Sequence, residues 1–114
     1  MDADRRAWFQ SRLEARQVEL EALSATSAGA RAAVTLDQQS VGRLSRMDAM
    51  QGQAMAQAQE RQRAGELVRI GRALAKIAEG EFGFCEECGE PIAEKRLEAD
   101  PTARLCIHCA ASAE

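Results

Sequence analysis

The sequence predicts a mainly α protein, in which a long antiparallel helical hairpin (coiled coil) precedes a compact four-cysteine module and a short terminal helix. Three observations predict this fold class. Ala, Gln, Glu and Arg are abundant among the 114 residues, as in coiled coils. No proline occurs between Leu36 and Gly80, so nothing in that interval forces a helix to break. All four cysteines lie within residues 85–109. We expect a hairpin over residues 1–80, with its tip near 30–45, and the cysteine module over 81–114.

The first helix is predicted from its start signal and its apolar stripe. Asp2 or Asp4 can cap the helix, because a carboxylate accepts hydrogen bonds from the first backbone N–H groups. An apolar stripe at helical spacing would face a partner helix. Its predicted members are Phe9, Leu13, Leu20 and Leu23.

The second helix is predicted to start near Leu36 or near Ser40 and to end before Gly80, a residue typical of helix C-termini. Its last part carries Leu67, Ile70, Leu74 and Ile77 at helical spacing. Upstream, the predicted inner face continues through Ala64, Ala58 and Ala54. Gly52, Gly65 and Gly71 permit a close approach of the first helix, because they have no side chain.

The segment after Gly80 is predicted to connect the second helix to the cysteines. Phe82 and Phe84 would fill the core between them, and turns are expected at Pro91 and at 100–102. Residues 107–113 are expected to form the terminal helix.

The cysteines have the spacing of a structural zinc site. Cys85 and Cys88 form one C-x2-C pair, Cys106 and Cys109 form another, and seventeen residues separate the pairs. Two such turns supply the four thiolates that a tetrahedral Zn²⁺ ion favours. Two disulfides, a redox-active CxxC or an iron–sulfur site are the competing interpretations. The fold class thus becomes a helical hairpin with a C-terminal four-cysteine zinc finger.

Composition and charge exclude several classes of function. The formal charge is −3, and four thiolates with one Zn²⁺ bring it to about −5. Such a chain gains little from the attraction to phosphates that drives DNA binding, so no specific DNA binding is expected. A single histidine and no nucleophile–base pair indicate that it is not an enzyme. A charged N-terminus and no long apolar run favour a cytoplasmic protein without a membrane segment, expected to be a monomer.

The segment from Gly80 to Cys109, GEFGFCEECGEPIAEKRLEADPTARLCIHC, resembles the signature of the DksA/TraR family of bacterial transcription regulators. The resemblance includes the complete cysteine spacing and a PTA-x-LC segment at 101–106. It implies a protein that binds RNA polymerase rather than DNA. In this family the coiled coil enters the secondary channel of the polymerase, and its tip approaches the active site and alters open-complex stability. Several members act with the alarmone ppGpp.

The coil tip departs from the family pattern. The best-known members carry D-x-x-D-x-A there, whereas an ungapped count back from Cys85 places Gly42 and Ser45 at the two acidic positions. The candidates for the tip are therefore residues near Gly42 and Ser45 rather than a pair of acids at the family spacing. They are Asp37, Leu44, Ser45, Arg46 and Asp48.

The positions linked to ppGpp also differ. The resemblance implies one basic residue on the second helix, which Arg69 matches, and another just before the PTA segment, where Asp100 stands. An acid there would repel a pyrophosphate, although nearby cations could compensate, so the response to ppGpp is left open. The candidate contacts to ppGpp or polymerase are Arg69, Arg72, Lys95, Arg96 and Arg104.

A zinc-ribbon DNA-binding module and a zinc–thiolate redox sensor remain as alternatives. The first needs a basic face, whereas the cysteine segment carries six acids. A redox sensor needs cysteines that can dissociate from the metal.

Overall fold

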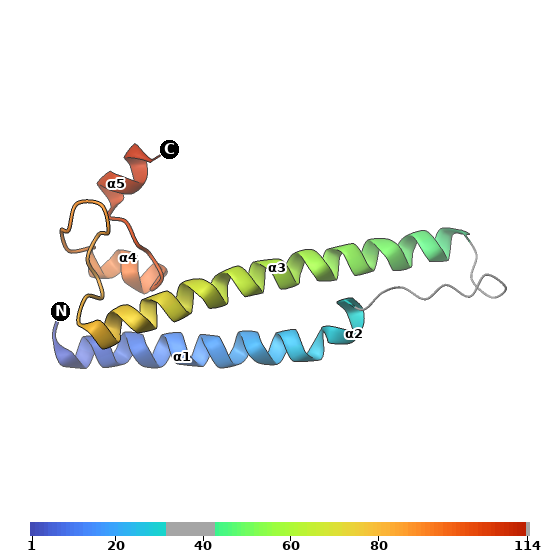
Figure 1. Cartoon of the computed structure of the whole chain (residues 1–114), viewed down its shortest axis with the longest axis horizontal. Coiled ribbons are helices and arrows are strands. Elements are labelled where there is room, and N and C mark those ends of the chain that lie inside the picture. Colours follow the sequence, from blue (N-terminus) through green and yellow to red (C-terminus); the bar gives the residue numbers. More distant parts are fainter. Residues whose placement is uncertain (32–42, 114) are drawn as a thin grey trace. The chain divides into compact units, whose positions relative to one another are not determined.

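A computed structural model describes the backbone of residues 1–31 and 43–113 and the side chains of 1–29 and 45–113. The described chain forms helices α1 (Ala3–Thr26), α2 (Ala28–Arg31), α3 (Arg43–Glu79), α4 (Glu94–Ala99) and α5 (Ile107–Ser112), drawn in Figure 1. An isolated antiparallel bridge pairs Phe84 with Pro91. The mainly α fold class and the terminal helix are confirmed. The predicted starts of the second helix and most of the predicted tip lie outside the described residues.

The ends of the two long helices follow from local hydrogen bonding. At the start of α1, Asp2 Oδ1 accepts the N–H of Arg5 at 2.8 Å, which identifies Asp2 as the cap. At the end of α3, the N–H of Glu81 donates to the Lys76 carbonyl at 2.8 Å and the N–H of Gly80 donates to the Ile77 carbonyl at 3.2 Å. Gly80 has a φ of 76°, so these two bonds complete a Schellman motif. The predicted end of the helix is confirmed.

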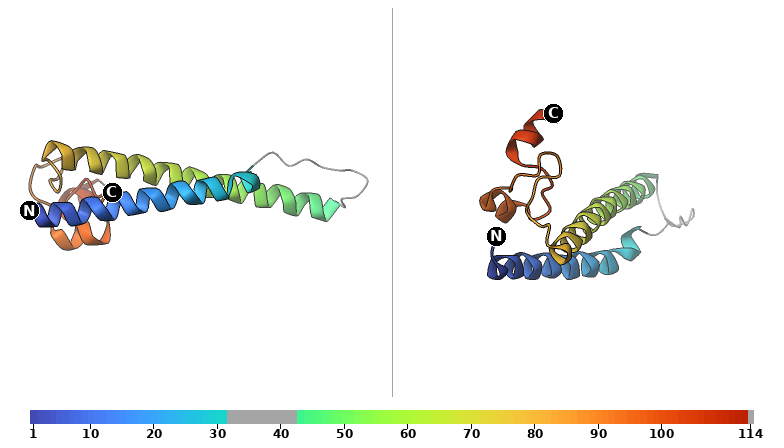
Figure 2. Two further views of the ribbon diagram at one scale, coloured as in Figure 1. Left: turned by 90° about the horizontal axis from the view of Figure 1, so that it is seen from below. Right: turned by 60° about the vertical axis from the view of Figure 1, so that its left-hand side comes forward.

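The chain divides into two compact units. One, which we call the finger unit, comprises Met1–Gln17 and Leu67–Glu114; the other, the coil unit, comprises Val18–Glu66. Within each unit, a part of α1 lies beside a part of α3 and runs in the opposite direction (Figure 2).

The finger unit has an apolar interior. Phe9 and Leu13 of α1, Ile70 of α3 and Leu97 of α4 are all no more than 2% exposed. Phe82 is 5% exposed, and its ring centroid lies 5.4 Å from that of Phe9. The sequence did not predict α4, whose buried Leu97 completes this core. Phe84 is 45% exposed, so its predicted role as core filler is wrong.

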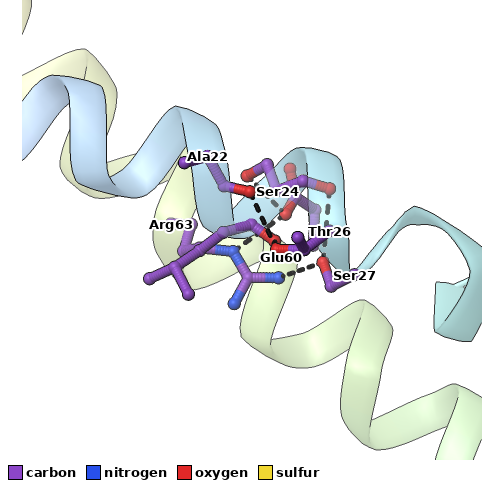
Figure 3. A network of polar contacts seen from close by, with 7 residues as sticks. Ala22, Ser24, Thr26, Ser27, Glu60 and Arg63 are labelled. Carbon is purple, nitrogen blue, oxygen red and sulfur yellow. Dashed lines mark hydrogen bonds and ion pairs between the residues drawn. The ribbon is translucent and has the colours of Figure 1, made fainter.

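The coil unit is held together by polar contacts around fewer apolar residues. Leu20 and Ala56 are buried. Ser24 Oγ donates to Glu60 Oε2 at 2.8 Å, Arg63 Nε donates to the same oxygen at 3.0 Å, and Arg63 Nη2 donates to Ser27 Oγ at 2.8 Å. Figure 3 shows these side chains meeting between the two helices.

The inner face of α3 therefore differs from the prediction in its first part. Two sets of residues seven apart are buried or half-buried, as in a heptad repeat. They are Arg46, Gln53, Glu60, Leu67 and Leu74 in one set, and Ala56, Arg63, Ile70 and Ile77 in the other. The predicted seam residues Ala64 and Ala54 are exposed, because polar side chains occupy the inner positions instead.

Two further predictions fail for related reasons. Leu23 is 44% exposed, since Ser24 takes the inner position beside it. Gly52 and Gly71 are exposed, and a Cβ at either would meet nothing within 4 Å, so they mark no close helix approach. In the described part of the chain, no helix combines the length and apolar character needed to cross a bilayer.

Candidate metal centre and basic pocket

The four cysteines converge on one point. Their Sγ atoms all lie within 4.8 Å of one another, and the Cys88 and Cys106 sulfurs are 3.8 Å apart. Four sulfurs at ~2.3 Å from one zinc ion in a tetrahedron are separated by about 3.8 Å. None of the four is in a disulfide. The geometry fits a single Zn²⁺, so the two-disulfide interpretation is wrong.

Backbone hydrogen bonds shape the two turns that present the sulfurs. The N–H of Gly89 donates to the Cys85 carbonyl at 2.9 Å, and the N–H of Cys85 donates to the Glu90 carbonyl at 2.8 Å. Gly89 has a φ of 76°, a conformation that side chains disfavour, which explains glycine at this point of the turn. The second pair lies at the start of α5, where the N–H of Ala110 donates to the Cys106 carbonyl at 2.9 Å.

The four thiols influence one another's ionisation. Backbone N–H groups of Cys88 and then Cys106 lower the pKa of the Cys85 thiol to about 6. Contacts with the sulfurs of Cys106 and Cys85 raise the pKa of Cys109 to about 12. The first thiolate thus forms readily and disfavours the last one, and a divalent cation removes that repulsion.

A small basic pocket, which none of the four cysteines lines, lies in the finger unit. Its floor is apolar and includes Ala73, Phe82, Phe84 and Pro101. Four cations line it: Arg69, Arg72, Lys76 and Arg104. The hollow encloses about 20 Å³, room for roughly one water molecule, so a larger ligand would lie across it rather than inside.

The pocket brings together three of the five predicted ppGpp or polymerase contacts, namely Arg69, Arg72 and Arg104. Lys76 joins them and was missed, although residues 69, 72 and 76 follow the spacing of one helix face. Lys95 is exposed and does not line the pocket. Arg96 donates from Nε to the Leu105 carbonyl at 3.0 Å, so it braces the loop before Cys106.

Asp100, the acid that could repel an anion, is held in a local turn. Its Oδ1 accepts the N–H of Thr102 at 3.0 Å and the Thr102 hydroxyl at 2.6 Å. Thr102 lines the pocket and Asp100 does not. These two hydrogen bonds partly neutralise the Asp100 carboxylate, so it repels an anion in the pocket less than a free carboxylate would.

The tip candidates separate into different environments. Ser45 and Asp48 are exposed on α3, whereas Arg46 is half-buried in the inner face of the coil unit. Asp37 and the side chain of Leu44 lie outside the described residues.

These features define a class of protein, a four-cysteine zinc finger carried by an antiparallel helical pair. Residues 80–114 match the family described as the prokaryotic dksA/traR C4-type zinc finger. Transcription factor DksA2 from Pseudomonas aeruginosa has a TM-score of 0.81 at 25% identity, covering 98% of this chain and 84% of that one. The DnaK suppressor protein from Agrobacterium tumefaciens C58 has a TM-score of 0.53 at 30% identity, covering 93% of this chain and 91% of that one. The chain belongs to the DksA/TraR family.

Among named relatives, sequence similarity covers less than half of this chain. The RNA polymerase-binding transcription factor DksA of Escherichia coli (strain K12) is 50% identical over 46 residues, which are 40% of this chain and 30% of that protein. The DksA of Buchnera aphidicola is 46% identical over 55 residues, which are 47% of this chain and 36% of that protein. The matched segment spans about a third of the length of these relatives.

Proposed function

We propose that this protein is a bacterial transcription regulator that binds RNA polymerase through its secondary channel and modulates the stability of promoter open complexes. The likeness to DksA2 over 98% of this chain carries the proposal, because it extends beyond the finger to the helical pair. The name of the finger's curated relatives, RNA polymerase-binding transcription factor, supports the same partner. The protein would act without catalysis, as a monomer in the cytoplasm.

In this function zinc has a structural role. Cys85, Cys88, Cys106 and Cys109 would hold one Zn²⁺, and four protein ligands leave no open position for a reactive water. The bound ion would fix the two cysteine turns to each other. Because the zinc-binding turns and the ends of the long helices share the finger unit, zinc supports the base of the helical pair.

The exposed end of α3 would act at the polymerase active site. Ser45 and Asp48 are exposed there and could contact polymerase or nucleic acid. Arg46 is half-buried in the coil unit, so its role would be structural. Asp37 and Leu44 stay as proposed tip residues.

The basic pocket is the proposed site for ppGpp. Four cations around an apolar floor suit a ligand that joins two diphosphates to a flat base. Arg69, Arg72 and Arg104 would contact the phosphates with Lys76. Lys95 is a candidate for polymerase contact only, and Arg96 is occupied by the Leu105 carbonyl.

Transcription in vitro tests the function. The zinc-loaded protein should bind core polymerase, compete with transcript-cleavage factors and change transcription from a ribosomal RNA promoter, more strongly with ppGpp. No binding to core polymerase would refute the proposal. Tight binding to duplex DNA at low salt would instead support a zinc-ribbon DNA-binding module, and zinc release by mild peroxide would support a redox sensor.

The proposed tip residues are tested by measuring polymerase affinity and the transcriptional effect separately. Asp48→Ala and Ser45→Ala should weaken the transcriptional effect about threefold to tenfold, as loss of one or two polar contacts does, and leave polymerase affinity unchanged. Glu79→Ala is the matched control, since Glu79 is an exposed acid at the other end of α3. Equal loss of affinity and effect would show that these residues are not at the tip.

A further inference from the structure

Two of the four cations in the basic pocket already face a carboxylate of this chain. Lys76 Nζ lies 3.5 Å from Glu86 Oε1, and Arg104 Nη1 lies 3.8 Å from Glu86 Oε2. The two oxygens of one carboxylate therefore each face a different pocket cation. Arg69 and Arg72 form no ion pair with another described residue.

The backbone fixes Glu86 at this place. Its N–H donates to the Arg104 carbonyl at 2.9 Å, which ties the first cysteine turn to the loop before Cys106. The Glu86 side chain is 30% exposed, and the Lys76 and Arg104 side chains are 28% and 50% exposed. Ion pairs that are this long and this exposed are weak, so a more highly charged anion can displace them.

We infer that Glu86 is an internal competitor for the anion site, and that it sets which anions the pocket accepts. The inference rests on the anion-binding pocket proposed above. An incoming phosphate gains Lys76 and Arg104 only by displacing the Glu86 carboxylate, and it also meets the repulsion of that charge. A singly charged anion offers no more than the carboxylate does. A ligand with two linked phosphates brings enough charge to displace Glu86 and to reach Arg69 and Arg72 as well.

The neighbouring acid provides a matched control. Glu87 follows Glu86 inside the same cysteine turn and is likewise exposed. Among the described residues, Glu86 is paired with Lys76 and Arg104, whereas Glu87 lines a hollow with His108 and Cys109. Glu86→Gln and Glu87→Gln remove the same charge from adjacent positions. Long-range electrostatics change nearly equally in the two variants, so a difference between them reports direct competition.

The experiment titrates the full zinc-loaded chain, labelled with ¹⁵N, with pyrophosphate at constant ionic strength and follows the backbone amides of Lys76 and Arg104. Zinc content is checked in each variant. Glu86→Gln should bind pyrophosphate about threefold to tenfold more tightly than the unaltered chain, whereas Glu87→Gln should bind less than about twofold more tightly. Acetate should shift these amides only in Glu86→Gln.

Three results would overturn the inference. Equal effects of the two variants would mean that net charge alone matters. Weaker binding by Glu86→Gln would mean that Glu86 positions the cations for the ligand. No binding by Glu86→Gln would mean that removing this charge opens no anion site. Polymerase is absent from this experiment, so its outcome is independent of whether the chain regulates transcription.

Discussion

In the finger unit, α1 and α3 contribute Phe9, Leu13 and Ile70 to an apolar interior, whereas in the coil unit the same helices contribute Ser24, Glu60 and Arg63. Of the ten buried apolar residues in the described chain, eight belong to the finger unit and two to the coil unit. Both units nevertheless follow one heptad spacing on α3. The two units therefore share the spacing of inner positions on α3, but they differ in the interactions that hold α1 against α3.

The difference has physical consequences. Apolar packing is non-directional and scales with the area buried, so in the finger unit it adds to the stabilisation that zinc provides. A hydrogen bond to a charged side chain gains much less, because the charge loses hydration. The bonds of Ser24 to Glu60 and of Arg63 to Ser27 nevertheless require specific partners, so they select one alignment of α1 and α3. The finger unit is expected to be the more stable of the two, and the coil unit to open locally at lower free energy.

Removal of a zinc ligand should have the largest effect. Structural zinc contributes roughly 10–16 kcal/mol in small zinc-finger peptides, so Cys88→Ser should lower the zinc content and disorder the finger unit. Elemental analysis and amide hydrogen exchange measure both. Protection in the coil unit should change much less than protection in the finger unit.

His108→Ala is the control for this variant. His108 lies between Cys106 and Cys109 and is exposed, so its loss should leave zinc content unchanged. Full zinc content in Cys88→Ser, or loss of zinc in His108→Ala, would show that the ligand set is wrong.

The second largest loss of stability is expected from a substitution in the apolar interior of the finger unit. Ile70 is 1% exposed, so Ile70→Ala should lower the free energy of unfolding by about 2–5 kcal/mol through lost burial and a cavity. Denaturant unfolding of the zinc-loaded protein measures it. Val68→Ala, two residues away, is the control, because Val68 is 61% exposed and should change stability by less than about 0.5 kcal/mol. Similar losses in the two variants would contradict the apolar finger interior.

Sequence alone predicted the finger unit better than the coil unit, for a physical reason. Metal ligands have fixed spacing and apolar residues fall on one face, so the sequence pattern predicts the cysteines, Phe9 and Leu13. In the coil unit the inner positions hold Glu60 and Arg63, which look like surface residues in a hydropathy pattern. The apolar pattern instead predicts Ala64 and Ala54 at the inner positions, and both are exposed.

The basic pocket shows a second limit of sequence reasoning. Its cations come from α3 and from the loop before Cys106, and an apolar floor joins them. Arg69, Arg72 and Arg104 were candidates on charge and on the family resemblance, but so were Lys95 and Arg96, which the structure places elsewhere. Charge identifies candidates for an anion site, whereas only tertiary packing selects among them.

The polar interior of the coil unit is tested by replacing Glu60 and Arg63. Arg63→Leu alone removes a bond to Glu60 and one to Ser27, and should destabilise the protein by about 1–3 kcal/mol. Adding Glu60→Leu should restore stability to the original level or above it, since well-packed apolar residues often replace a buried ion pair without loss. Thermal unfolding measures the series.

Arg61→Leu is the control for this series, because Arg61 is exposed on the same helix. It should change stability by less than about 0.5 kcal/mol. A double variant that is less stable than Arg63→Leu would show that the remaining polar contact of Glu60, with Ser24, stabilises the coil unit more than apolar packing does.

The smallest effect is expected from the ion pairs at the edge of the finger unit. Arg5 Nη2 lies 2.5 Å from Glu98 Oε1, and the Arg5 guanidinium lies 4.7 Å from the centre of the Trp8 ring. The Arg5 and Glu98 side chains are 30% and 47% exposed, so solvent screens the pair. Arg5→Met keeps the aliphatic stem over Trp8 and should cost less than about 1 kcal/mol, a loss that shrinks as salt is added. Polar contacts would then contribute little to the stability of the finger unit and much to that of the coil unit. An Arg5→Met variant as unstable as Arg63→Leu would contradict that distinction.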